Sequence, residues 1–168
     1  MEKFINDHGK KIIGWDEILE GGLAPNATVM SWRGTQGAIN AAKEGHDDIL
    51  TPTSHCYFDY YQDNFSYEPL AIGGYLPLKK EYGFNPIPSE LNHKESQFVL
   101  GAQGNVWTEY IKTEEQVEYM VFPRILALGE VVWSGASQNI KVEYPEFLFR
   151  LESYLDRLDV MDIHYANH

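Results

Sequence analysis

The sequence has one cysteine, Cys56, among its 168 residues, so an internal disulfide is excluded. No second thiol stands near it in a metal-ligand spacing, and the six histidines are scattered along the chain. A glycine-rich phosphate motif is also missing, since GTQG at residues 34–37 is too short and has no lysine. We therefore expect neither a metal nor another cofactor.

Positive charge and long apolar runs are scarce as well. Thirteen Lys and Arg stand against 25 Asp and Glu, a net charge of −12 that repels nucleic-acid phosphates and anionic lipids. The apolar runs are only a few residues long, so neither a membrane span nor a signal peptide is visible. A hydrophobic content of 43%, with 14% aromatic residues, predicts one ordered domain over residues 1–168.

Four short apolar segments are predicted to be strands: residues 10–15, 27–32, 48–53 and 97–103. A short helix that ends at Gly45 should follow the second of them. Residues 60–96 form a long connection rich in Tyr, Pro, Gly and Asn, with a helical turn near 77–82. A connection of that length usually shapes a binding site.

Two helices are predicted after the fourth strand. Thr113 and Gln116 form a capping-box pattern, and the apolar face that follows indicates one long helix through Val132, kinked at Pro123. We expect Trp133, next on that helix, to lie in the core. The last helix is predicted to begin at Pro145 and to bury Phe147, Leu148, Leu151, Tyr154, Leu155 and Leu158.

The strands are apolar on both faces and alternate with helices, which is typical of a parallel sheet covered by helices. Four such units in 168 residues correspond to about half of a (β/α)8 barrel, whose usual length is about 250 residues. The predicted fold is therefore α/β, with strands 5 to 8 of such a barrel, their helices and a C-terminal helix.

Aromatic and acidic groups follow the predicted strands: Trp15, Trp32, Tyr57 with Asp59, and Trp107 with Glu109. In a parallel barrel all these ends lie on one face, where binding and catalysis occur. Aromatic faces stack on the apolar face of a pyranose and carboxylates accept its hydroxyl protons, so the set favours a sugar ligand. Any one of these tryptophans, taken alone, is more often a core residue.

The i, i+2 spacing predicts that Tyr57 and Asp59 share one side of an extended chain, and likewise Trp107 and Glu109.

Several motifs in order carry a family resemblance: GWDEI, VMSWRG, GHDDILTPTSHCYFDYYQ, EPLAIGGYLPLKKEY, GAQGNVWTEY and FPRILALGEVVWS. From about Gly9 to the C-terminal helix, the chain resembles the second half of the catalytic barrel of family 20 glycoside hydrolases, the β-N-acetylhexosaminidases. An ordered series of motifs is far more specific than any one of them.

The resemblance implies a role for each residue at the strand ends. Trp15, Trp32 and Trp107 would wall the pocket for the sugar ring and its N-acetyl group. Tyr57 would hydrogen-bond the acetamido carbonyl oxygen and hold it beneath the anomeric carbon. Asp59 and Glu109 would bind sugar hydroxyls, Glu109 the 4-hydroxyl.

In this family the nucleophile is the substrate's own acetamide, which forms an oxazolinium ion, and configuration is retained. The acid and the aspartate that polarises the amide form an adjacent Asp-Glu pair, which the resemblance assigns to a strand before this chain begins. Asp16 and Glu17 are adjacent but follow a different strand, so we expect them to cap the helix that begins near Ile18. The isolated chain should then be almost inactive.

The resemblance implies N-acetylhexosamine-containing glycans as partners, and a periplasmic, extracellular or lysosome-like compartment rather than the cytoplasm. A half barrel also predicts contact with the missing N-terminal half, or association of copies through exposed barrel edges.

Three alternatives stay open: a non-catalytic carbohydrate-binding module, a scaffold or interaction domain, and a complete glycosidase that uses Asp59 and Glu109 as its two carboxylates.

Overall fold

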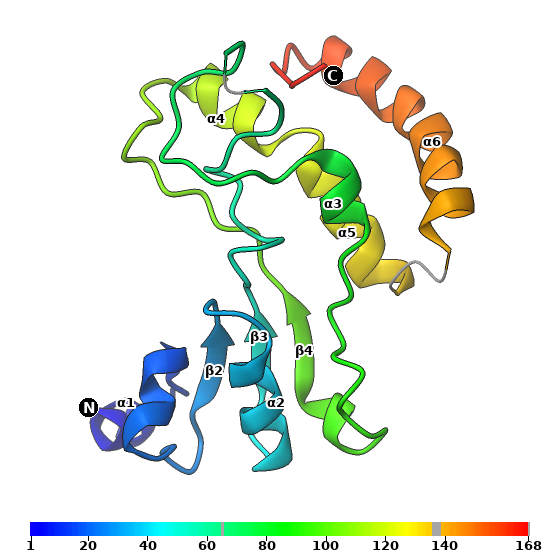
Figure 1. The fold of residues 1–168 in the computed structure, drawn as a ribbon. Coiled ribbons are helices and arrows are strands. Elements are labelled where there is room, and N and C mark those ends of the chain that lie inside the picture. Colours follow the sequence, from blue (N-terminus) through cyan, green and yellow to red (C-terminus); the bar gives the residue numbers. More distant parts are fainter. Residues whose placement is uncertain (65, 136–138, 168) are drawn as a thin grey trace. The chain divides into compact units, whose positions relative to one another are not determined.

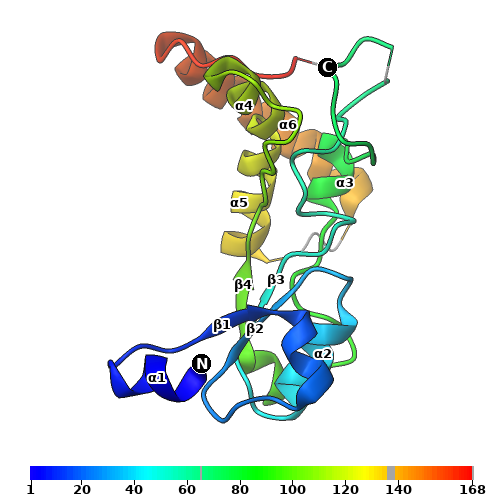
Figure 2. The same ribbon diagram turned by 90° about the vertical axis from the view of Figure 1, so that its left-hand side faces the viewer.

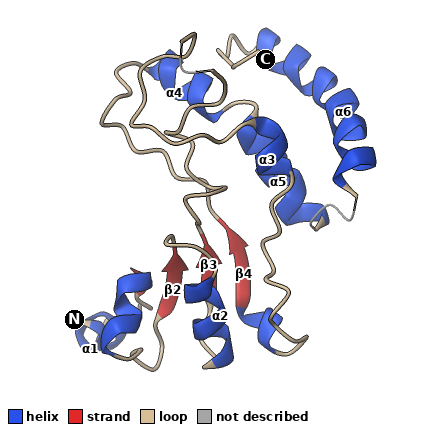
Figure 3. Ribbon diagram, in the orientation of Figure 1, coloured by secondary structure: helices blue, strands red, loops and turns tan. Residues whose placement is uncertain are grey.

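The computed structural model describes residues 1–64, 66–135 and 139–167. The chain divides into two compact units, one formed by residues 1–54 with 86–103 and the other by residues 55–85 with 104–168. The first unit contains the β-sheet, and the second contains most of the helices (Figure 1, Figure 3).

The sheet of the first unit has four parallel strands in the order β1-β2-β3-β4. The strands are β1 (Ile13–Trp15), β2 (Thr28–Ser31), β3 (Asp48–Leu50) and β4 (Val99–Ala102). Neighbours in the sequence are neighbours in the sheet, as in a barrel built from successive crossover connections. The predicted parallel α/β arrangement is confirmed, although each strand is shorter than the apolar segment that predicted it.

The first unit also contains short helices: α1 (Glu2–Asp7) before the sheet, α2 (Gln36–Lys43) between β2 and β3, and the 3-10 helices η1 (Asp16–Gly21) and η2 (Glu95–Phe98). Figure 2 shows β1 beside β2, with α2 on the sheet. The alanines of α2 are fully buried and leave room for the helix to pack closely on β2 and β3, where Val29 and Leu50 are buried as well. Gly45 takes a φ of +81° just after α2, the left-handed position that ends many helices.

A buried carboxyl group lies in the first unit, on the first residue of β3. Asp48 has no solvent exposure, and the Ser31 hydroxyl donates a hydrogen bond of 2.6 Å to its Oδ1. Burial, with a smaller contribution from the charge of Asp16, raises the pKa of Asp48 to about 7, although the Ser31 hydrogen bond partly opposes the shift. The folded chain therefore holds a proton on Asp48 that the unfolded chain releases at lower pH.

This raised pKa predicts a loss of stability as pH rises. Between about pH 4 and pH 7 the unfolded state binds fewer protons than the folded state, so the free energy of unfolding should fall by up to about 1.4 kcal/mol per pH unit. Asp48→Asn keeps an oxygen for Ser31 and should remove this contribution. Denaturant unfolding at several pH values measures it; an unchanged pH slope in Asp48→Asn would contradict the assignment.

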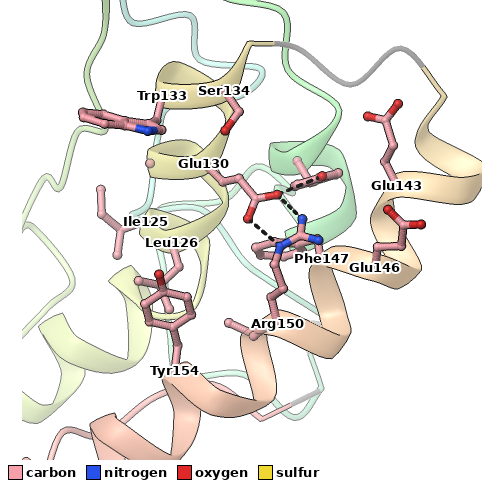
Figure 4. Close-up of a pocket in the computed structure, with 13 residues that line it drawn as sticks. Ile125, Leu126, Glu130, Trp133, Ser134, Glu143, Glu146, Phe147, Arg150 and Tyr154 are labelled. Carbon is pink, nitrogen blue, oxygen red and sulfur yellow. Dashed lines mark hydrogen bonds and ion pairs between the residues drawn. The ribbon is translucent and has the colours of Figure 1, made fainter.

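The second unit contains α3 (Leu78–Tyr82), α4 (Glu114–Val121), α5 (Arg124–Ser134) and α6 (Ile140–Val160). The Tyr82 ring of α3 stacks on Phe147 of α6 with centroids 4.5 Å apart, and its hydroxyl donates to Glu130 of α5 at 3.1 Å. Arg150 of α6 pairs with the same glutamate (Figure 4). Three helices thus share one packing centre.

The long helix predicted over residues 113–132 is wrong in one respect, because it is two helices. The capping box is confirmed, since the Thr113 hydroxyl accepts from the Gln116 N–H at 3.2 Å. Phe122 is extended, at φ −93° and ψ 140°, as the residue before a proline prefers. Pro123 therefore separates α4 from α5 instead of kinking one helix.

The core position predicted for Trp133 is also wrong. Its side chain is 91% exposed, and Figure 4 shows it pointing away from α6. The apolar stripe of α5 is carried by Ala127, Leu128 and Val131, which are buried. Trp133 follows this stripe in sequence but lies off its face.

The last helix begins at Ile140, five residues before the predicted start at Pro145. The Tyr144 ring contacts Tyr82 and Phe147, with centroids 5.7 and 6.1 Å away. We attribute the early start to this tertiary packing, which outweighs the hydrogen bond that Pro145 cannot donate. Of the residues predicted to be buried, Phe147, Leu151 and Leu158 are buried, Leu155 is half-buried, and Leu148 and Tyr154 are exposed. Among the described helices, none combines the length and apolar character that crossing a bilayer requires.

Candidate functional site

Two segments of the second unit that are far apart in sequence are joined by backbone hydrogen bonds. The Phe58 N–H donates to the Asn105 carbonyl at 2.8 Å, and the Asn105 N–H donates to the Cys56 carbonyl at 2.6 Å. These bonds form an isolated parallel bridge between Tyr57 and Asn105. The bridge brings the segment of Tyr57 and Asp59 beside the segment that leads to Trp107 and Glu109.

The i, i+2 spacing predicted that Tyr57 and Asp59 share one side of an extended chain. This is wrong, because residues 58–59 form a turn. Asp59 is nevertheless close to the other segment, since it accepts a hydrogen bond from the Trp107 backbone N–H. Tyr57 and Asp59 are buried, whereas Trp107 is 43% exposed and Glu109 is exposed. The four residues thus combine a buried phenol and carboxyl with an accessible indole and carboxylate.

The Asp59 carboxyl is only 4% exposed and is not fully satisfied. Burial, with a smaller contribution from the charge of Glu109, raises the pKa of Asp59 to about 6, while Arg124 and the N–H groups of Asp59 and Trp107 oppose the shift. In the part of the chain that the structure describes, Asp59 Oδ1 has no hydrogen-bond partner. A buried acceptor without a partner is costly, so this oxygen is suited to a ligand hydroxyl.

Gly104 allows the two segments to approach. A Cβ at this position would lie 2.5 Å from Cε2 of the Phe58 ring. The guanidinium of Arg124 lies 5.2 Å from the centroid of the same ring. Phe58, which precedes Asp59, thus packs against the backbone at Gly104 and against the Arg124 side chain of α5.

Sequence reasoning did not assign a role to two charged residues beside this site, Arg124 and Glu81. Both have no solvent exposure. The available signal was position: in the single long helix that the sequence predicts, Arg124 falls four residues from Met120 and from Leu128, on the apolar side. A charged residue at a core position is rare unless it is paired, and therefore marks a constrained site.

The remaining predicted residues, Trp15 and Trp32, belong to the first unit. Trp15 ends β1 and is half-buried, and Trp32 directly follows β2. The Trp32 indole N–H donates to both carboxylate oxygens of Glu17 at 3.2 Å. That these two tryptophans wall the same pocket as Trp107 stays a prediction.

The capping role predicted for Asp16 and Glu17 is wrong in one respect: both lie in the first turn of η1, but η1 has no side-chain cap hydrogen bond. Asp16 instead accepts from the Arg33 Nε at 2.8 Å and from the Arg33 N–H at 3.2 Å. Hydrogen bonding from its own backbone N–H, then from Trp32, lowers the pKa of Glu17, with the Arg33 charge adding to the effect. Both carboxylates are therefore engaged with the segment after β2.

Two cavities of the second unit lie elsewhere. One of about 770 Å³ is lined by α5 and α6 around Glu130 and Arg150 (Figure 4), and one of about 470 Å³ by residues before and within α3 and by α6. Neither is lined by Tyr57, Asp59, Trp107 or Glu109. Among the described residues, no group of three or more His, Cys, Asp or Glu side chains is placed to hold a metal ion.

Comparison with known proteins identifies the family. A model described as glycosyl hydrolase family 20, catalytic domain, matches residues 1–136, and the chain therefore belongs to this family. A beta-hexosaminidase from Porphyromonas gingivalis is 50% identical over 165 residues, which cover 98% of this chain and 21% of that protein. A beta-hexosaminidase from Vibrio furnissii is 34% identical over 131 residues, 76% of this chain and 21% of that protein.

Solved structures agree on the fold. The GH20 exo beta-N-acetylglucosaminidase from Vibrio harveyi, in complex with N-acetylglucosamine, matches with a TM-score of 0.84 at 28% identity, covering 99% of this chain and 26% of that one. The GH20 beta-N-acetylhexosaminidase from Streptomyces coelicolor has the same TM-score at 23% identity, a likeness of fold. The chain spans about a fifth of the length of the two curated relatives, and its four strands are part of a (β/α)8 barrel.

Proposed function

We propose that residues 1–168 supply the pocket for a sugar and its acetamido group in a β-N-acetylhexosaminidase, as strands 5 to 8 and the C-terminal portion of its catalytic barrel. The observation that carries the proposal is the buried Asp59 carboxyl, whose Oδ1 has no partner among the described residues and which lies beside the segment of Trp107 and Glu109. The names of the relatives and the N-acetylglucosamine bound to the Vibrio harveyi enzyme support an acetamido sugar as the ligand.

In the proposed reaction the substrate's acetamido oxygen attacks the anomeric carbon as the glycosidic bond breaks, and an acid protonates the leaving oxygen. Water then opens the resulting oxazolinium ion, so configuration is retained. Tyr57 donates a hydrogen bond to the acetamido oxygen and holds it in position for attack. Trp107 stacks on the sugar ring, while Asp59 and Glu109 accept hydroxyl protons.

The acid and the polarising aspartate are proposed to come from outside residues 1–168. The engagement of Asp16 with Arg33, and of Glu17 with Trp32, supports this, because neither carboxylate is left to serve a substrate. We expect the whole protein to meet its glycans outside the cytoplasm.

The test measures sugar binding and substrate hydrolysis separately. The purified 168-residue chain should bind N-acetylglucosamine, with NMR shifts at the Trp107 indole, yet release no chromophore from a chromogenic β-N-acetylglucosaminide. Glucose is the matched control, since it lacks the acetamido group and should bind more weakly. Equal affinity for both sugars, or turnover that Asp16→Asn abolishes, would contradict the proposal.

Association through the barrel edges is a further part of this proposal. The sheet order places β1 and β4 at the edges, and Ile13 and Leu100 on these strands are 53% and 59% exposed. Exposed strand edges with apolar side chains pair with other chains. The 168-residue chain should elute from gel filtration above its monomer mass, and Ile13→Lys should lower the apparent mass; elution as a compact monomer would contradict this expectation.

A further inference from the structure

One buried arginine binds the carbonyl groups on both sides of Asp59. The Arg124 Nη1 donates to the Tyr60 carbonyl at 3.0 Å, and its Nη2 donates to the Phe58 carbonyl. We propose that Arg124 is a positioning residue, which fixes the turn of Asp59 and so aims its carboxylate at the sugar. This inference rests on the proposed role of Asp59 as a sugar ligand.

The same side chain ties the turn to two other segments. Nη1 also donates to the Leu76 carbonyl at 3.1 Å, just before α3, and Nε donates to the Met120 carbonyl in α4 at 3.2 Å. Only a guanidinium offers five donors in a rigid planar fork that can satisfy four carbonyl groups at once. Lysine at this position would keep the charge but lose the fork.

The charge of Arg124 also acts on Asp59. Burial lowers the pKa of Arg124 to about 10, and the neighbouring acidic groups of Glu81, Glu68, Asp59 and Tyr119 limit the fall, so Arg124 remains a cation at neutral pH. The charge of Arg124 lowers the pKa of Asp59, whereas the charge of Glu109 raises it. Arg124 thus favours the ionised form of Asp59, the form that accepts two hydroxyl protons.

Glu81 interacts electrostatically with Arg124 but makes no hydrogen bond to it. It has no exposure, and neither carboxylate oxygen has a hydrogen-bond partner among the described residues. Burial raises its pKa to about 8, and the charges of Arg124 and Lys80 limit the rise. The guanidinium donors are therefore given to the Asp59 turn and its neighbours, which is the arrangement that positioning requires.

The test uses the Arg124→Met and Arg124→Lys variants of the full-length protein. Arg150→Lys is the control, since Arg150 makes an ion pair with Glu130 in the same unit, away from the site. Carbon-13 carboxyl NMR measures the Asp59 titration without sugar, and Asp59→Asn identifies its signal. We expect Arg124→Met to raise the Asp59 midpoint, and Arg124→Lys to leave it near the wild-type value.

Kinetics then separate the fork from the charge. Arg124→Lys should lower kcat/KM for a β-N-acetylglucosaminide by about a hundred-fold, the size of effect that a misplaced group produces, whereas Arg150→Lys should leave it unchanged. A folded Arg124→Lys protein with wild-type kcat/KM would overturn the inference, as would an unchanged Asp59 midpoint in Arg124→Met. If Arg124→Met does not fold, the Lys variant decides. The Asp59 midpoint could also rise in Arg124→Met while the wild-type protein hydrolyses no β-N-acetylglucosaminide. That outcome would reject the proposed function and keep the positioning role of Arg124.

Discussion

Replacing Tyr57 by phenylalanine should lower kcat for β-N-acetylglucosaminide hydrolysis by about a hundred-fold, the size of effect that misplacing a reacting group produces. The Tyr57 ring is buried and lies 5.6 Å from the ring of Tyr60, a contact that phenylalanine retains. Only the hydroxyl, which we propose holds the acetamido oxygen, is lost. Steady-state kinetics of the full-length protein, with circular dichroism to check folding, measure this effect.

Tyr82→Phe is the matched control, because Tyr82 is also a buried tyrosine of the second unit. Its hydroxyl donates to Glu130, between α3 and α5. Loss of that bond should reduce the free energy of unfolding by about 1 kcal/mol and leave kcat unchanged. Equal losses of kcat in both variants would indicate a structural role for Tyr57 and contradict its contact with the acetamido group.

Asp59→Asn should weaken sugar binding by about ten- to a hundred-fold, the value of one or two hydrogen bonds to a charged acceptor. It should also remove a pH dependence. With a pKa of about 6, Asp59 becomes protonated as pH falls through 6 and loses its charge and part of its capacity as an acceptor, so the affinity of the wild-type protein should fall there. Titration calorimetry between pH 5 and 8 should find a flat profile for the variant.

If the loss of activity in Asp59→Asn depends on the leaving group of the substrate, the result would favour the scheme in which Asp59 is itself the general acid. The raised pKa and the neighbouring Glu109 charge would suit that role. An acid variant loses most activity on substrates with poor leaving groups and little on substrates with good ones. For a sugar-binding Asp59, the loss in Asp59→Asn should be the same for both kinds of substrate.

The order of the strands could be predicted because each is a short apolar run between helical segments. Such a pattern requires a parallel sheet covered by helices, and β1 to β4 follow it. The helix ends were predicted well where a local signal exists, as at Thr113 and Gly45. The start of α6 at Ile140 was not predicted, because it depends on the packing of Tyr144 against Tyr82 of α3.

The candidate site could be predicted only in part. Tyr57, Asp59, Trp107 and Glu109 were selected by residue type and by resemblance, but their approach depends on one backbone bridge at Asn105 and on the missing side chain of Gly104. Neither feature has a periodic signature. Arg124 was missed because its partners are carbonyl groups from three separate segments, and carbonyl groups are the same in every residue.

The comparison of two substrates tests the central claim most directly. The full-length protein should be assayed on a β-N-acetylglucosaminide and on the β-glucoside with the same leaving group. If the chain forms the acetamido pocket of a hydrolase whose nucleophile belongs to the substrate, only the first should be turned over, with retention of configuration. Comparable rates on both substrates would mean that the acetamido group takes no part, and would contradict the account.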